Sequence, residues 1–305
     1  EHIAGTGASF NRYYNDFDTA PSAAYQTANV ATKISYGGND TPYTFDVCGN
    51  MLTEGSSRHF EYDAGDVLRA FYVDSGAGTE PSVFTHYLYD AGGNRVKKIT
   101  RKSTGNPQVS LYIDGAIDTH YELDGSLSPI EIEQEFHIMD GRARVARRTV
   151  YDSGFSGTQS IEFKFNLEDH LGTSSCTLDD NGAVYSYEEY FPFGETSFGS
   201  FAKKRYRYCG KERDEESGLY YYGARYYAAW TCRFVNLDPL AGSLVHQSPF
   251  CYAGNSPVTL TDVDGLAPGG PGGGGPGGGS SQNSHPMITQ QNKYNSATIP
   301  YPGNY

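Results

Sequence analysis

The chain has 305 residues, and its 36 acidic against 23 basic side chains leave a net charge of −13 at pH 7. An acidic chain repels the phosphates of nucleic acid, so a nucleic-acid partner is not expected. Charged residues make up only 19% of the chain, which argues against a long charged helix or coiled coil. No run approaches 18 apolar residues, so no transmembrane helix is predicted. The chain opens with Glu1 and has no apolar leader, and we expect a processed product or a fragment.

Tyrosine and glycine dominate the composition, with 26 Tyr and 37 Gly against 3 Met and 1 Trp. Aromatic residues favour strands, and glycine favours tight turns. This balance predicts an all-β chain of short strands joined by tight turns. An all-β chain of this length can form one unit, so length alone does not divide it.

A short repeat recurs along the first 200 residues: an aromatic or apolar residue, Asp, one or two further residues, then Gly and often Asn. Its clear copies are FDVCGN at 45–50, YDAGD at 62–66 and YDAGGNR at 89–95, and weaker copies lie at 113–115, 123–125, 139–142, 151–154 and 178–182. The Asp side chain can accept a hydrogen bond from the backbone two residues on, and Gly or Asn tolerates a positive φ. The flanking segments, such as HFEY at 59–62, alternate in polarity as strands do. The repeat therefore predicts β-hairpins that combine into a curved or spiralling antiparallel sheet.

Two charged segments follow the repeats. The basic run KKRYR at 203–207 is interpreted as a solvated strand edge that pairs with the acidic residues 212–216. The acidic segment itself fits either a short helix or a loop, and the loop is preferred.

The chain offers little sign of a metal or cofactor site. None of its five cysteines has metal or redox spacing, and their odd number fits either buried thiols or one or two disulfides. His170 lacks a partner at ligand spacing, so a role in a turn or in the core is expected. The segment 262–265 hints at a calcium loop, but the twelfth position of such a loop would be Gly273 instead of Glu. We therefore predict no metal and no cofactor.

The composition changes sharply after residue 266. Residues 267–279 read APGGPGGGGPGGG, and residues 280–305 are polar with a final Ile-Pro-Tyr-Pro stretch before the C-terminus. Such a segment cannot bury a core, so residues 267–305 are predicted to form an extended Gly/Pro-rich tail.

The segment between the repeats and the tail resembles the RHS repeat-associated core of the RHS/YD-repeat family. The resemblance rests on these matches: DHLG at 169–172, YFPFGE at 190–195, GKERD at 210–214, GLYYYGARYY at 218–227, RF at 233–234, DP at 238–239, YAGNSPV at 252–258 and DVDGL at 262–266. It covers about residues 40–266, and the tyrosine-rich block at 218–227 is its most specific part. It divides the chain into a YD-repeat region at 1–200, a core at 201–266 and the tail.

The resemblance implies a shell and an activity. YD repeats of the family form a β-hairpin strip that spirals into a shell, which in toxin relatives encloses a variable C-terminal toxin. The family's core resembles an aspartyl autoprotease with two Asp-Pro-x-Gly segments. In this chain the first segment begins at Asp238, and its Gly stands one place later than in the family's motif. The second segment begins at Asp262 and has Val263 where the motif has Pro. By this resemblance Asp238 and Asp262 form the catalytic pair, with Asp264 as substitute for Asp262.

Further residues follow from the same resemblance. Arg225 stands where the family has its assisting arginine, and the scissile bond would join Leu266 to Ala267. Two carboxyls that share a proton supply an acid and a base, and a nearby guanidinium favours the ionised one. Without the resemblance, both Asp residues would be interpreted as turn residues.

Two functional hypotheses remain, and the structural one is preferred. In it, the chain is a subunit of an extracellular or cell-surface filament or tube, because it is too short to close a toxin-sized shell and its tail is too short and Gly-rich for a toxin. Open sheet edges recruit other chains, and the tail would dock on a neighbouring subunit to form a homopolymer. In the alternative, the chain is the end of an RHS toxin carrier, with autoproteolysis after Leu266. A surface adhesin is a third possibility that no residue set singles out.

Overall fold

A computed structural model describes residues 13–17, 30–36, 39–74, 76, 80–152, 159–199, 204–243, 246–266 and 268–269. Apart from residues 268–269, the tail predicted at 267–305 lies outside these ranges. No helix within them is long and apolar enough to cross a membrane.

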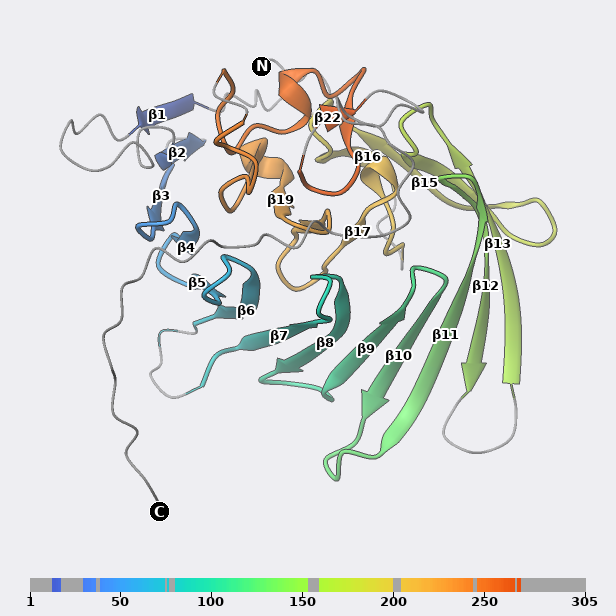
Figure 1. Ribbon diagram of the computed structural model, residues 1–305. Coiled ribbons are helices and arrows are strands. Elements are labelled where there is room, and N and C mark those ends of the chain that lie inside the picture. The colour runs from blue at the N-terminus through green and yellow to red at the C-terminus, as the bar shows by residue number, and fades with distance from the viewer. Residues whose placement is uncertain are drawn as a thin grey trace.

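One antiparallel sheet of 16 strands dominates the molecule, and its strands follow one another in chain order. Figure 1 shows this sheet curling around the later part of the chain. The predicted all-β fold with a curved antiparallel sheet is confirmed. The strands are β1 (Tyr13–Phe17), β2 (Ala31–Tyr36), β3 (Asn39–Phe45), β4 (Met51–Glu54), β5 (Arg58–Tyr62), β6 (Leu68–Val73), β7 (Val83–Tyr89), β8 (Arg95–Lys102), β9 (Gln108–Ile113), β10 (Ile117–Leu123), β11 (Pro129–Asp140), β12 (Ala143–Asp152), β13 (Gln159–Glu168), β14 (Ser174–Leu178), β15 (Val184–Tyr190) and β16 (Thr196–Gly199).

The repeated Asp forms the same turn at six positions. Its Oδ1 accepts hydrogen bonds from the backbone N–H groups two and four residues on, at 2.8–3.1 Å, and the residue three places on has a positive φ. The turns begin at Asp46, Asp63, Asp90, Asp124, Asp169 and Asp179. The left-handed position is Gly in four turns, Asp66 and Leu127 in the others. A local five-residue pattern thus sets six of the connections between neighbouring strands.

Two of the weaker copies, at 123–125 and 178–182, form this Asp turn, and the other copies differ. At 113–115 both Asp114 and Gly115 have positive φ, and at 139–142 Gly141 lies in a two-residue hairpin loop. The copy at 151–154 lies partly outside the described residues.

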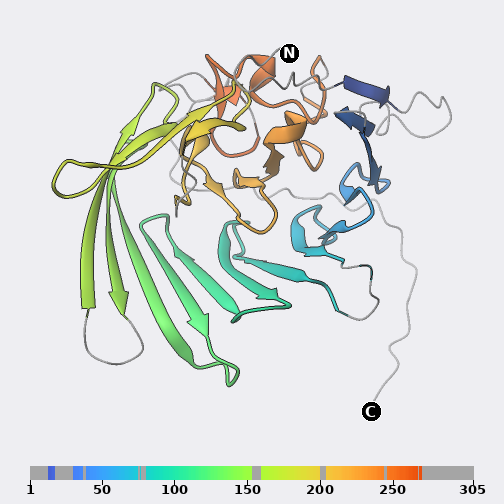
Figure 2. The ribbon, with the colours of Figure 1, turned by 180° about the vertical axis from the view of Figure 1, so that it is seen from behind.

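The later part of the chain lies inside the curl of the sheet (Figures 1 and 2). Its described residues, 204–243, 246–266 and 268–269, are called the plug below. Its four-stranded sheet joins β17 (Glu212–Arg213), β18 (Tyr220–Tyr221), β19 (Tyr226–Ala228) and β20 (Arg233–Phe234), and a separate pair joins β21 (Thr261–Asp262) to β22 (Pro268–Gly269). Three one-turn 3₁₀ helices complete it: η1 (Tyr208–Gly210), η2 (Ala229–Thr231) and η3 (Ala253–Asn255).

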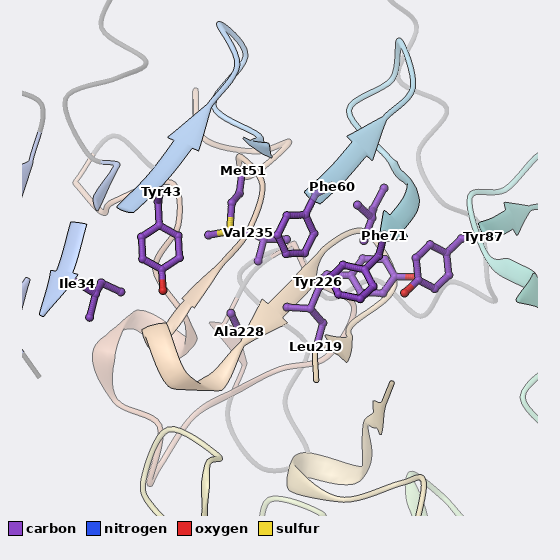
Figure 3. Packing of buried hydrophobic residues seen from close by; sticks show 11 residues of the cluster. Ile34, Tyr43, Met51, Phe60, Phe71, Tyr87, Leu219, Tyr226, Ala228 and Val235 are labelled. Carbon is purple, nitrogen blue, oxygen red and sulfur yellow. The ribbon is translucent and has the colours of Figure 1, made fainter. Parts of the chain in front are cut away.

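The hydrophobic core joins the early strands to the plug. From the sheet come Ile34, Tyr43, Met51, Phe60, Leu68, Phe71 and Tyr87, and from the plug Leu219, Tyr226, Ala228 and Val235. Figure 3 shows Tyr226 between Phe71 and Tyr87 on one side and Leu219 on the other. Burying each large apolar side chain contributes on the order of 1.5–3 kcal/mol, so this contact holds the plug against β2–β7.

The tyrosine-rich block at 218–227 forms a second, largely aromatic cluster within the plug. Tyr222 and Tyr227 pack against Phe234 and Tyr252 with ring centroids 4.3–5.9 Å apart. The hydroxyl groups of Tyr222 and Tyr252 are hydrogen-bonded at 2.9 Å, so burial leaves these polar groups paired.

The two charged segments pair along their backbones as predicted, but four of their charged side chains are buried and not solvated: Lys204, Arg207, Glu212 and Asp214. Tyr206 forms a bridge with Glu212, while Lys204 and Arg207 are buried and contact Glu188 of the large sheet. Residues 212–213 form a strand in place of the preferred loop. The long side chains reach the surrounding sheet because the plug is enclosed by it.

None of the five cysteines forms a disulfide, and Cys209 is the buried one among them. His170 lies in the turn that begins at Asp169, where its Nε2 donates to the Val258 carbonyl at 3.0 Å. Its predicted role in a turn agrees with this position.

Candidate active site in the plug

Arg225 lies at the centre of the candidate site. It follows the turn between β18 and β19, and its side chain is 1% exposed. The guanidinium carbon lies 3.7 Å from the centroid of the Phe234 ring, which covers one face of the group. Its Nε donates to the carbonyl of Gly265, and one Nη donates to the carbonyl of Pro249. The guanidinium is therefore held in one orientation.

Two buried carboxylates flank this guanidinium. Asp238 Oδ2 lies 3.0 Å from Nη1, and Asp262 Oδ2 lies 3.1 Å from Nη2. The structure thus brings together Arg225, Asp238 and Asp262, which are separated by up to 37 residues in the chain. None of the described hydrogen bonds joins the two carboxylates to each other, because each is directed at the arginine.

Local backbone geometry positions both carboxylates. Asp238 lies four residues after β20, where its N–H donates to the Pro249 carbonyl and its Oδ1 accepts from the N–H of Leu240 at 2.7 Å. Asp262 lies in β21, and its Oδ1 accepts from the N–H of Gly265 at 2.8 Å. Gly265 has φ +82°, and a Cβ there would lie 2.9 Å from the backbone nitrogen of Arg225, so this close approach requires glycine.

Burial governs the protonation of the site. It raises the pKa of Asp262 to about 6, although Arg225 and the N–H of Gly265 act in the opposite direction. Burial also raises the pKa of Asp238, again against the effect of Arg225. The pKa of Arg225 is lowered, first by its own burial. A single guanidinium compensates one of the two carboxylates, so a proton on the other is favoured.

Asp264 and the proposed scissile segment lie beside this centre. Asp264 is exposed, and its Oδ1 accepts from the N–H of Leu266 at 3.1 Å. Asp262 pairs with Pro268 across the β21–β22 hairpin, so Leu266 lies in the hairpin loop. Ala267 lies outside the described residues.

Lys211 also contributes to the site, although the sequence did not predict it. The buried amine of Lys211 donates to the carbonyl of Val263, which lies between Asp262 and Asp264. Burial lowers the pKa of Lys211, against the attraction of both carboxylates. The only sequence signal was its place in the GKERD segment at 210–214.

Comparison with known proteins shows that the chain is similar in sequence to toxin subunits. It is 31% identical over 282 residues to toxin subunit YenC1 of Yersinia entomophaga, which covers 88% of this chain and 28% of that protein. Its homologues include toxin subunits. The chain thus spans little more than a quarter of this curated relative. Its structure is similar to the crystal structure of TcdB2-TccC3, with a TM-score of 0.66 and 27% identity over 79% of this chain and 13% of that one.

Other relatives vary in kind. Salivary gland surface protein 1 of Aedes aegypti is 40% identical over 188 residues, which covers 58% of this chain and 5% of that protein. Further relatives are described as toxins or tRNA nucleases. No family model matches the chain. The comparisons therefore support a toxin-related class for the chain.

Proposed function

We propose that this chain is the end of an RHS/YD-repeat toxin carrier, in which a shell of β-hairpins surrounds an aspartyl autoprotease. The proposal favours the second hypothesis from the sequence, because toxin subunits are among the relatives. The chain's residues 201–266 would be the protease core, and the Leu266–Ala267 bond would be cut. The carrier would act outside the cell that makes it.

The observation that carries the proposal is the placement of Asp238 and Asp262 on the single buried guanidinium of Arg225. A buried pair of carboxylates with one cation is costly to fold, and such arrangements concentrate at active sites. Gly265 links the site to the proposed scissile segment, since its N–H contacts Asp262 and its carbonyl contacts Arg225.

In the proposed reaction, water attacks the carbonyl carbon of Leu266. Asp238 accepts a proton from that water, and Asp262 donates its proton to the nitrogen of Ala267 as the C–N bond breaks. Asp262 suits the acid because its pKa of about 6 keeps a proton on it at mildly acidic pH. Arg225 stabilises the carboxylate that is ionised at each stage.

The test is intact-mass analysis of the purified 305-residue chain after expression. The expected wild-type products are a chain that ends at Leu266 and a fragment that begins at Ala267. Asp262→Asn keeps the shape of the side chain but cannot donate the proton in the same way, so we expect cleavage to fall at least about 100-fold, as it does when a general acid is lost.

Asp180→Asn is the control, because it removes an exposed carboxylate from a turn outside the candidate site and should leave cleavage nearly unchanged. The proposal fails if the folded wild-type chain stays uncut between about pH 5 and about pH 8. It also fails if Asp262→Asn is cut at the wild-type rate.

A second candidate is the filament subunit preferred from the sequence. The sheet ends in β1 and β16, which have no further strand beside them within the described residues. Four apolar side chains of β13 are also exposed on one face: Ile161, Phe163, Phe165 and Leu167. Edges and faces of this kind can bind further copies of a chain. The toxin subunits among the relatives add no support to a homopolymer.

Negative-stain electron microscopy separates the two candidates. Filaments of uniform width that are lost when residues 267–305 are deleted would support the filament and the docking of the tail on a neighbour. Filaments that survive this deletion would contradict tail docking, and isolated particles would contradict the filament itself.

A further inference from the structure

Strands β10 and β11 place three potential metal ligands on the face of the sheet that meets the plug. Asp118 of β10 is paired directly with Glu135 of β11, and His120 lies two residues after Asp118. Residues two apart on a strand share a face, and directly paired residues of an antiparallel sheet lie side by side. The three side chains therefore converge.

Each of the three side chains has one buried atom without a hydrogen-bond partner among the described residues: Asp118 Oδ1, His120 Nε2 and Glu135 Oε2. The three residues offer ligand atoms that all lie within 4.8 Å of one another. Asp118 and Glu135 are each only 1% exposed. An unpartnered buried polar atom destabilises the fold, and three in one place indicate a shared ligand.

The remaining atoms of Asp118 and His120 are already occupied. Asp118 Oδ2 accepts from the hydroxyl of Tyr206 at 2.5 Å and lies 2.8 Å from His137 Nε2. His120 Nδ1 lies 2.8 Å from Ser110 Oγ. In the tautomer that donates from Nδ1 to this hydroxyl, the lone pair of Nε2 is directed to the cluster, as in metal-binding histidines.

Glu135 is oriented in the same way. Its Oε1 lies 3.3 Å from Arg147 and 3.4 Å from Arg205, which leaves Oε2 free to face the other two ligands. Outer groups that fix a ligand's orientation in this manner are characteristic of metal sites.

We propose that Asp118, His120 and Glu135 bind one divalent metal ion, with Zn²⁺ as the best match. One imidazole nitrogen and two carboxylate oxygens form a set of three protein ligands that Zn²⁺ accepts, with a fourth position for water. The double negative charge of the carboxylates balances the ion. All three ligands lie on strands, so the register of β10 against β11 brings them together.

A cavity of about 270 Å³ beside His120 gives an ion access. Its lining is polar and includes six glutamates: Glu122, Glu131, Glu133, Glu212, Glu215 and Glu216. Their negative potential would attract a cation, and Lys98, Arg205 and Arg213 of the same lining only partly offset it.

The ion would connect the sheet to the plug. Tyr206 and Arg205 belong to the segment that enters the plug, and they contact Asp118 and Glu135 respectively. Metal binding would therefore stabilise the assembled state of sheet and plug. This proposal does not depend on autoproteolysis, because none of its residues contacts Arg225, Asp238 or Asp262 in the described hydrogen bonds.

The experiment measures Zn²⁺ binding by the whole chain after treatment with a chelator. Isothermal titration with Zn²⁺ and elemental analysis should give about one ion per chain. His120→Gln and Glu135→Gln keep the size of the side chains and should each weaken binding by about 10-fold or more. His86→Gln on β7 is the matched control and should bind as the wild type does.

A thermal melt supplies the second readout. Zn²⁺ should raise the Tm of the wild type and of His86→Gln, because a ligand that binds only the folded state stabilises it. Zn²⁺ should raise the Tm of Glu135→Gln by clearly less than that of the wild type, and this variant decides the matter if His120→Gln does not fold. A wild type that binds no ion would overturn the proposal in favour of buried water. Equal binding by the wild type and both variants would overturn it in favour of another site.

Discussion

At the residue scale, a single arginine organises the candidate active site. Arg225 contacts Asp238 and Asp262 through its two terminal nitrogens and fixes the chain at Pro249 and Gly265 through carbonyl groups. A lysine could not make these contacts together, because its ammonium lacks the planar fork of donors. Arg225 therefore stabilises the fold and also orients the two carboxylates of the proposed reaction.

The pH dependence of stability should reveal the buried Asp262. Its pKa is about 6 in the folded protein against 3.8 for an unperturbed aspartate, so the folded state binds the proton more tightly. Protonation therefore favours folding, and this contribution is lost as the pH rises from about 4 through about 6, by up to ~3 kcal/mol. Asp262→Asn carries no titrating group and should show a flatter decline.

Urea unfolding at several pH values tests this prediction. The difference in unfolding free energy between the wild type and Asp262→Asn should change across this range. Parallel curves would show that Asp262 has an ordinary pKa in the folded protein.

At the element scale, the Asp-initiated turn is the repeated unit of the fold. The side chain of the first residue supplies two hydrogen bonds to the backbone, so the turn depends little on the sheet around it. Surrounding structure still adds constraints at some turns. Gly194, with φ +89°, ends a similar turn without Asp, and a Cβ there would lie 2.5 Å from the ring of Tyr208.

The turn between β14 and β15 allows a matched test of this unit. Asp179→Ala removes the hydrogen bonds to the N–H groups of Asn181 and Ala183 and should lower the unfolding free energy by about 1–2 kcal/mol. Asp180→Ala removes the same charge from the next residue, whose carboxylate accepts only from the Asn181 side chain among the described bonds. It should cost less than about 0.5 kcal/mol. Similar losses in both variants would contradict the role of the Asp in the turn.

At the scale of the whole molecule, buried ion pairs join the sheet to the plug. Arg95 of β8 contacts Glu212 and Asp214, and Lys98 contacts Asp214 and Glu216. The guanidinium of Arg95 also lies over the rings of Tyr112 and Tyr221, at 4.5 and 4.4 Å from their centroids. Cations of the sheet thus pair with carboxylates of the plug, and apolar side chains of the two parts pack together.

Removing these ion pairs should weaken the attachment of the plug to the sheet. Arg95→Met would leave Glu212 and Asp214 buried without their main partner, which costs roughly 3–5 kcal/mol. Arg101→Met on the same strand is the control, since Arg101 is exposed, and it should cost less than about 0.5 kcal/mol. Chemical denaturation gives the free energies, and limited proteolysis should cut the plug of Arg95→Met first. Equal stability of both variants would show that these pairs do not hold the plug.

Features that depend on near neighbours in the chain could be predicted from the amino-acid sequence. The Asp turn spans five residues, and the strands between turns alternate in polarity, so the antiparallel all-β fold followed from local patterns. The resemblance of residues 218–227 and of the two Asp segments identified Arg225, Asp238 and Asp262, and the structure brings these three together.

Features that depend on partners far apart in the chain could be seen only once the chain is folded. The acidic residues at 212–216 resembled a solvated loop because the cations that bury them lie in β8, more than 100 residues earlier. The cluster of Asp118, His120 and Glu135 was hidden for a related reason. Asp118 and His120 alternate as many strand residues do, and only the register of β10 with β11 brings Glu135 beside them. Register and burial arise from the whole sheet closing around the plug, and no local pattern specifies them.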